Sequence, residues 1–303
     1  MKKYIILFAA LAGAMLWTGC QKMEEDIVKD EPVEEAPQLF TLTVHAVKDV
    51  DTKALELDGS TLNAYWVDGE EVAVYNKSTR AFLGMLTVDA DETDPTEATL
   101  SGTLSSVEGV DVSTQLYLLF PRAEWDYTGQ DGTAPSAGGS LARQYDYASA
   151  TVYVSSMDNG VISTSKAYFS NEQKIYRFGF KIGGSGGTAV SVKEFTVDSD
   201  AHNSIVRKCD YSSNKYTCSS LTVKVSGAAT QDLLYMAIKN NIPSNQTYSF
   251  HVIDGGNALY TGSQNIPFQT NDILRKSNFI SAQNVSVSQA TLTSASATTS
   301  EVW

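Results

Sequence analysis

Period-two alternation of apolar and polar residues constrains the fold of this chain more than any other feature. It recurs along the sequence, and turn pairs such as Asp68-Gly69 and Asn159-Gly160 fall between the repeats. No stretch keeps a helical period for more than a turn or two. Short antiparallel strands of this kind predict an all-β protein built from β-sandwiches. The clearest runs are 40–47 (FTLTVHAV), 72–75 (VAVY), 151–154 (TVYV), 221–225 (LTVKV) and 248–252 (YSFHV).

The length of the alternating region predicts two tandem domains, 38–170 and 171–303. About 265 of the 303 residues follow the N-terminal region, which is long for one sandwich. Residues 129–143 form a Gly/Ser/Ala-rich loop, which we interpret as an excursion within the first domain. The glycine run at 183–187 is either a flexible linker between domains or a wide hairpin connection.

The first twenty residues have the layout of a secretory signal peptide that ends at a cysteine. Lys2 and Lys3 precede an apolar run at 4–17, which is too short for a comfortable membrane span. Small residues then lead to Cys20. This pattern predicts a lipoprotein signal peptide at 1–19 and lipid on Cys20, where each buried methylene of a palmitate-type chain contributes about 0.8 kcal/mol. An ordinary signal peptide with a chance cysteine is the alternative, because Trp17 stands where the usual lipobox has leucine.

Residues 20–37 predict an acidic, solvated tether. Residues 21–37 hold seven acidic and two basic side chains and few large apolar groups. The conformational entropy lost on ordering them would therefore exceed the free energy gained by burying apolar surface. The cluster at 24–26 (EED) resembles a signal that sends lipoproteins to the outer face of the outer membrane. A linker with no address is the other interpretation. The expected location is therefore the cell surface, with a lipid anchor in the outer membrane.

Charge and composition exclude one class of partner. The formal net charge is −13, and no basic run supplies the surface that phosphate contacts require. We therefore expect no nucleic-acid partner.

Two cysteines remain after Cys20, and they flank a predicted turn. Cys209 and Cys218 lie on either side of residues 212–215 (SSNK), and two strands that fold back there would bring them opposite one another. Because exported proteins meet an oxidising environment, this spacing predicts a disulfide, with two free thiols as the alternative.

Candidate chemistry in the rest of the chain is sparse. His45, His202 and His251 are isolated in sequence, and the strand pattern places His45 and His251 on solvent-facing positions. No nucleophile elbow or paired-carboxylate pattern is present. We therefore predict no catalytic residues, no cofactor and no enzymatic activity.

Two further stretches have a binding interpretation and a structural one. Residues 88–97 (VDADETDPTE) cluster carboxylates, which either hold calcium or form a solvated acidic turn. The EF-hand spacing is absent, so no metal site is predicted. Trp125 and nearby tyrosines either form a sugar-stacking surface or belong to the core.

Several segments together resemble the fimbrillin family, the lipoprotein pilins of the type V pilus. The family carries a W-x-x-G-D-x-V-x-V-Y strand, which residues 66–75 (WVDGEEVAVY) match with Glu70 in place of the aspartate. Residues 116–121 (LYLLFP) are similar to its Y-x-x-Y/F-P strand end. The segments 52–54 (TKA), 191–197 (SVKEFTV) and 234–238 (LYMAI) fit more loosely.

The resemblance implies two transthyretin-like sandwich domains and a structural, adhesive role. It implies that an Arg/Lys-specific protease removes the first strand, here after Lys53 or alternatively Lys48, and that another fimbrial subunit donates a strand to the vacated groove. Main-chain hydrogen bonding along an open edge supports such an exchange. The adhesion ligand, on a host or bacterial surface, is not specified.

The C-terminal residues 284–303 have two interpretations. They either form a donor strand, with Val285 and Val287 filling a neighbour's groove, or the last strand of their own domain. The competing function is a monomeric surface lipoprotein that binds glycan or another ligand in a nutrient-uptake system.

Overall fold

The computed structural model describes residues 39–48, 56–58, 61–63, 65–134, 144–184, 186–199, 205–227, 229–239, 246–266 and 280–290. The predicted signal peptide, Cys20, the tether, Lys53, His202 and residues 291–303 lie outside these ranges. All the elements that the structure describes are strands, so the all-β prediction is confirmed. Within the same ranges, no helix has the length and apolar character needed to cross a membrane.

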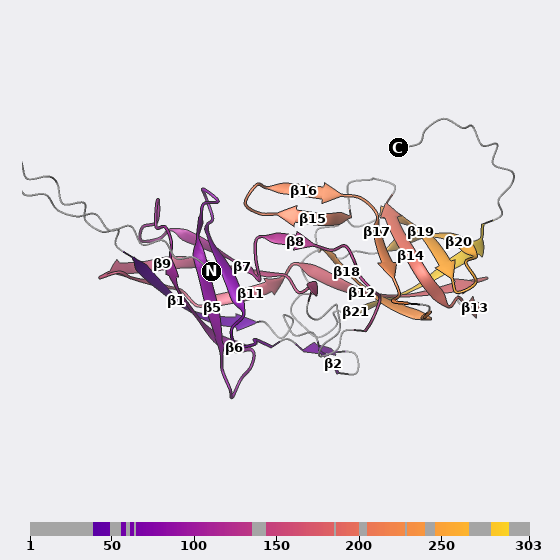
Figure 1. Ribbon diagram of the computed structural model, residues 1–303, viewed down its shortest axis with the longest axis horizontal. Coiled ribbons are helices and arrows are strands. Elements are labelled where there is room, and N and C mark those ends of the chain that lie inside the picture. The colour runs from indigo at the N-terminus through magenta and orange to yellow at the C-terminus, as the bar shows by residue number, and fades with distance from the viewer. Residues whose placement is uncertain are drawn as a thin grey trace, which may run out of the picture. The chain divides into compact units, whose positions relative to one another are not determined.

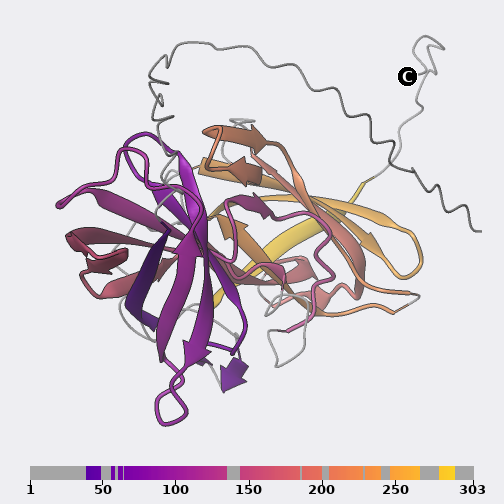
Figure 2. The same cartoon turned by 60° about the vertical axis from the view of Figure 1, so that its left-hand side comes forward.

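The first sheet closes on itself into a barrel (Figures 1 and 2). Its neighbours run in the order β10-β1-β11-β9-β7-β4-β5-β6, and β6 pairs with β1 to complete the circle. The strands are β1 (Phe40–Lys48), β4 (Glu71–Asn76), β5 (Phe82–Ala90), β6 (Glu97–Leu104), β7 (Gln115–Phe120), β9 (Ala148–Asp158), β10 (Val161–Thr164) and β11 (Ala167–Asn171).

The second sheet is a half-barrel with the order β13-β12-β21-β20-β19-β14-β17, and β18 pairs with β12 beside this path. Its strands are β12 (Gln173–Ile182), β13 (Thr188–Ala189), β14 (Val192–Ser199), β17 (Leu221–Lys224), β18 (Leu233–Lys239), β19 (Gln246–Asp254), β20 (Leu259–Ile266) and β21 (Ile280–Gln289). Two small sheets remain, one of β8 (Glu124–Asp126), β15 (Val206–Asp210) and β16 (Lys215–Cys218), the other of β2 (Glu56–Asp58) and β3 (Thr61–Asn63).

The predicted alternating runs fall inside strands, except that the run 221–225 extends one residue beyond its strand. They lie in β1, β4, β9, β17 and β19, and the Asn159-Gly160 turn joins β9 to β10. Both turn residues have positive φ, 52° and 76°, which is the geometry of the two-residue hairpin turns that match strand twist. Antiparallel pairing dominates as expected, but β1 pairs in parallel with β10 and β11, and β12 pairs in parallel with β21.

Two buried clusters correspond to the two large sheets. One lies inside the barrel and includes Leu42, Val74 and Phe169. The other includes the second sheet's phenylalanines and also Tyr75 and Leu119 from β4 and β7. Strands β4 and β7 are therefore buried on both faces, which explains why they read as nearly continuous apolar runs.

The change from the first sheet to the second falls at Glu172, between β11 and β12. Residues Gln38–Trp303 group as one compact unit, so the division into domains 38–170 and 171–303 stays a prediction, as does the transthyretin-like sandwich architecture. The glycine run at 183–187 joins β12 to β13, which pair in antiparallel fashion, so the hairpin interpretation of this segment is correct.

The loop that starts at residue 129 behaves differently from the expectation. We expected an excursion within the first domain, yet its described part bonds to β17 and β18 of the second sheet. The backbone oxygen of Gln130 accepts from Lys224 N of β17 at 3.0 Å, and that of Gly132 accepts from Tyr235 N of β18 at 3.0 Å. Residues 130–132 therefore bridge the gap between β17 and β18.

Gly132 has no room for a side chain in this bridge. Its φ is +78°, and an added Cβ would lie 2.8 Å from both Val223 Cγ1 and Leu234 Cδ2. Replacing Gly132 with alanine is expected to lower the free energy of unfolding by about 1–3 kcal/mol, through backbone strain and overpacking. Urea unfolding measures this. Gly227 also has a positive φ (+71°) but nothing within 4 Å of an added Cβ, so Gly227→Ala isolates the backbone term. Equal losses in the two variants would contradict the packing argument.

Candidate functional site

The first strand, β1, is the candidate functional element because it closes the barrel between two neighbours. Along one edge it pairs with β6 in antiparallel register from Phe40 to Val47. Along the other edge it pairs in parallel with β10 and then with β11. Its ends are tied by Thr41 N to Gly160 O and by Lys48 N to Thr96 O, both at 2.8 Å. Without β1 the barrel would have two open edges.

Every second residue of β1 points into the barrel. Leu42, Val44 and Ala46 are at most 1% exposed, whereas Thr43 and His45 between them are exposed. Full burial of a valine or leucine side chain is worth about 1.5–3 kcal/mol, so this row anchors the strand strongly. Removing β1 would therefore leave an apolar groove lined by the barrel core.

The last inward residue of β1 is Lys48, which is 1% exposed. Its ammonium lies 3.6 Å from the centroid of the Trp66 ring and 4.6 Å from that of Phe120. It also donates a hydrogen bond to Tyr65 O at 3.2 Å. Phe169 stands edge-on to Trp66, with the ring centroids 5.1 Å apart. A buried lysine needs such partners, and ring faces attract a cation.

The two candidate processing residues differ in what the structure says of them. Lys48 is buried within a paired strand, so a protease has no extended, exposed segment to bind there while β1 is in place. Lys53 lies outside the described residues. Cleavage after Lys53, or after Lys48 as the alternative, stays a prediction.

The candidate donor segment forms a strand of its own sheet in this structure. β21 pairs in parallel with β12 from Ile280 to Val287, and with β20 at Gln289 and Ser288. Val285 and Val287 are 0% and 3% exposed and belong to the second core cluster. The described part of 284–303 therefore occupies the position of a last strand, and its donor role stays a prediction.

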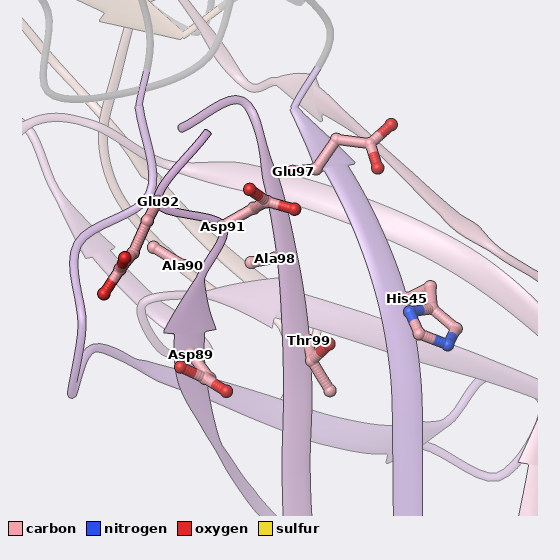
Figure 3. A pocket seen from close by; sticks show the side chains of 8 residues that line it. All are labelled: His45, Asp89, Ala90, Asp91, Glu92, Glu97, Ala98 and Thr99. Atoms are coloured by element: carbon pink, nitrogen blue, oxygen red, sulfur yellow. The ribbon is translucent and has the colours of Figure 1, made fainter. Parts of the chain in front are cut away.

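The acidic stretch 88–97 lies beside the outer face of β1 and lines an open pocket of about 340 Å³ with His45 (Figure 3). In Figure 3 the carboxylates of Asp89, Asp91, Glu92 and Glu97 point in different directions rather than toward a common point. Among the described residues, no group of three or more His, Cys, Asp or Glu side chains is placed to hold a metal ion.

Hydrogen bonds within the loop use these carboxylates. Asp91 Oδ1 accepts from Thr93 Oγ1 at 2.6 Å, from Thr93 N at 2.7 Å and from Asp94 N at 3.1 Å. The Thr93 hydroxyl, followed by the backbone N–H groups of Thr93 and Asp94, lowers the pKa of Asp91. Asp94 Oδ1 accepts from Thr96 in the same way. The geometry is that of a solvated turn stabilised by its own aspartates.

The structure buries Trp125 and exposes His45 and His251. Trp125 is 3% exposed, stacks on Tyr147 with centroids 5.7 Å apart, and donates its indole N–H to Arg122 O, so its ring belongs to the core. It contributes to an open pocket of about 470 Å³ over the small β8-β15-β16 sheet, which is lined largely by charged side chains. His45 and His251 are exposed, as the alternation predicts.

Cys209 and Cys218 are free thiols in this structure, and the disulfide between them stays a prediction. The turn occupies residues 211–214, one residue earlier than the expected 212–215, so Asp210 pairs with Lys215 and Cys209 with Tyr216. A register shift further from the turn then pairs Cys218 with Val206. The prediction assumed that the two cysteines lie opposite one another across the hairpin. In the structure they do not. Burial raises the pKa of the Cys209 thiol.

No protein-family model matches the sequence, and no curated protein matches it. Solved structures with a similar arrangement include candidate cell adhesion proteins from Bacteroides ovatus (11% identity, 82% of this chain and 95% of that chain, TM-score 0.41) and Bacteroides uniformis (11%, 82% and 97%, 0.40). A fimbrial assembly protein from Parabacteroides distasonis is also similar (12%, 81% and 90%, 0.38). Similarities this distant establish neither a shared family nor a shared function.

Proposed function

We propose that this chain is a structural subunit of adhesive cell-surface fimbriae, exported as a lipoprotein and polymerised by strand exchange. The observation that carries the proposal is the position of β1, a first strand that pairs on both edges and fills the barrel core. Its loss would expose two strand edges and an apolar groove. Such a groove is a template for an incoming strand, with main-chain hydrogen bonds for affinity and alternate side chains for specificity.

Removal of β1 by proteolysis after Lys53 is the activating step in this proposal. The lipid on Cys20 would leave with the first strand, so the outer-membrane anchor serves export and is then released. The donor is a C-terminal strand of another subunit. β21 has the required alternation at Val285 and Val287, although its pairing with β12 must break before it can be donated.

Treatment of the purified precursor with an Arg/Lys-specific protease tests the proposal. We expect a single early cut after Lys53, loss of residues 20–53, and conversion of monomer into a ladder of polymers. N-terminal mass spectrometry, gel electrophoresis and negative-stain microscopy measure these steps. Lys53→Gln is the matched control, because it removes the cut and leaves the described strands unchanged.

Two results would contradict the proposal. The first is a precursor that is cut after Lys53 and stays monomeric with β1 still in place. The second is polymer formed equally well by Lys53→Gln. A monomer that resists the protease and binds glycans would instead favour the ligand-binding surface lipoprotein, for which the buried Trp125 ring offers no stacking platform.

A further inference from the structure

The inward row of β1 is apolar at Phe40, Leu42, Val44 and Ala46 and cationic at its last position, Lys48. Leu42, Val44 and Ala46 pack in the barrel core, and Lys48 continues the same parity at the end of the strand. A lysine here is costly to bury unless its ammonium has partners. An apolar residue would satisfy the alternation equally well, so the presence of lysine needs its own explanation.

Among the residues that the structure describes, two aromatic rings and one carbonyl contact the Lys48 ammonium. Trp66 and Phe120 present ring faces at 3.6 and 4.6 Å, and Tyr65 O accepts a hydrogen bond at 3.2 Å. Phe169, opposite Lys48 in the β1–β11 register, packs against Trp66. We call Trp66, Phe120, Phe169 and the Tyr65 carbonyl the aromatic cage. All four residues lie outside β1, so the cage belongs to the acceptor groove.

We propose that the aromatic cage is a specificity subsite of the groove, and that it selects an incoming strand with a lysine or arginine at its last inward position. The inference rests on the proposed strand exchange. The pattern that the groove recognises is read from residues 42–48: apolar residues at the first, third and fifth positions and a cation at the seventh. For the cage to select a cation, the attraction of the ring faces and the Tyr65 carbonyl for the ammonium must exceed the cost of removing the ammonium from water.

The proposal identifies the partner by chemistry. Residues 280–303 of this chain contain no lysine or arginine, so the C-terminal segment of a second copy would leave the cage without a cation. The preferred donor is therefore a strand from a different subunit that carries a basic residue at this position. The groove would accept a second copy's tail only with lower affinity.

Peptide exchange into the full-length chain tests this subsite. A specific protease site replaces residues 51–54, the chain is cut once, and fluorescent peptides compete for the groove, measured by anisotropy. The peptides are residues 40–48 with the native sequence, with Lys48→Met, with Lys48→Arg and with Thr43→Ala, and residues 280–288. We expect the Lys48→Met peptide and the 280–288 peptide to bind at least about tenfold more weakly than the native one. The Lys48→Arg and Thr43→Ala peptides should stay within about threefold.

A Trp66→Leu chain separates recognition of the cation from general packing. If the cage reads charge, this variant binds the native and Lys48→Met peptides equally, whereas a purely structural role for Trp66 would weaken both by the same factor. Equal affinity of these two peptides for the native chain would overturn the subsite and leave strand exchange standing. Failure of the native peptide to bind at all would overturn both proposals.

Discussion

Val44→Asp is expected to lower the free energy of unfolding by about 4 kcal/mol or more. Val44 is 1% exposed in the middle of the inward row of β1. The substitution removes an apolar side chain worth about 1.5–3 kcal/mol on burial, and it places a carboxylate in the barrel core, where it must be desolvated or protonated. Urea unfolding followed by tryptophan fluorescence measures the loss.

Thr43→Asp is the matched control. Thr43 is the adjacent residue of the same strand, and it is exposed, so the same charge there should change stability by about 0.5 kcal/mol or less. If Val44→Asp and Thr43→Asp lowered the free energy of unfolding by similar amounts, the assignment of Val44 to the inward face of β1 and Thr43 to the outward face would be wrong.

Val44→Asp also tests the link between β1 and function. If β1 is the element that blocks the groove, weakening its packing should let an uncut chain bind the peptide of residues 40–48, whereas uncut Thr43→Asp should not. A Val44→Asp chain that stays folded and excludes the peptide would mean that the groove needs more than the release of β1.

The alternation in the sequence predicted the strands because burial on one face imposes it directly. Residues 40–47 alternate since their even positions fill the barrel, and the described structure places His45 on the outside as expected. The closure of the first sheet was not predictable in this way. It depends on which strands become neighbours, above all the parallel pairing of β1 with β10 and β11 across more than 110 residues.

The choice of the first strand as the functional element stays a prediction, and the surroundings of Lys48 were missed. The first strand was identified as the removable element, but Lys48 was considered only as a cleavage residue. Its inward parity was visible in the alternation, since 42, 44, 46 and 48 share one face. The aromatic cage was not visible, because Trp66 and Phe120 are distant in sequence. The structure places Cys209 opposite Tyr216 rather than Cys218 because the turn falls one residue earlier than expected, at 211–214, which spacing alone does not reveal.

Gln130 had no sequence signal at all. It lies in a Gly/Ser/Ala-rich stretch, where a single glutamine is normally an exposed loop residue. In the structure it is 2% exposed, and its side chain bonds to the edge of β18 as a neighbouring strand would. Ala237 N donates to Gln130 Oε1 at 2.6 Å, and Gln130 Nε2 donates to Ala237 O at 2.8 Å. Only the packed fold reveals this role.

Gln130→Met is therefore expected to lower the free energy of unfolding by about 3–5 kcal/mol. Methionine has nearly the same length, so packing is conserved while three hydrogen bonds are lost: the two to Ala237 and the one from Nε2 to Tyr127 O at 2.9 Å. Each buried backbone group left without a partner costs about 1–3 kcal/mol. Gln115→Met, at an exposed position of β7, is the matched control and should change stability by about 0.5 kcal/mol or less.

Hydrogen exchange, measured amide by amide in both large sheets, shows where Gln130→Met weakens the structure. If residues 130–132 hold the edges of β17 and β18 together, hydrogen exchange in Gln130→Met should accelerate first at the amides of Ala237 and Tyr235, which bond to this segment. Amides of β1 paired with β6 should keep their protection until global unfolding. A Gln130→Met chain within 1 kcal/mol of Gln115→Met, or one that loses protection first in β1, would refute the role assigned to the bridge.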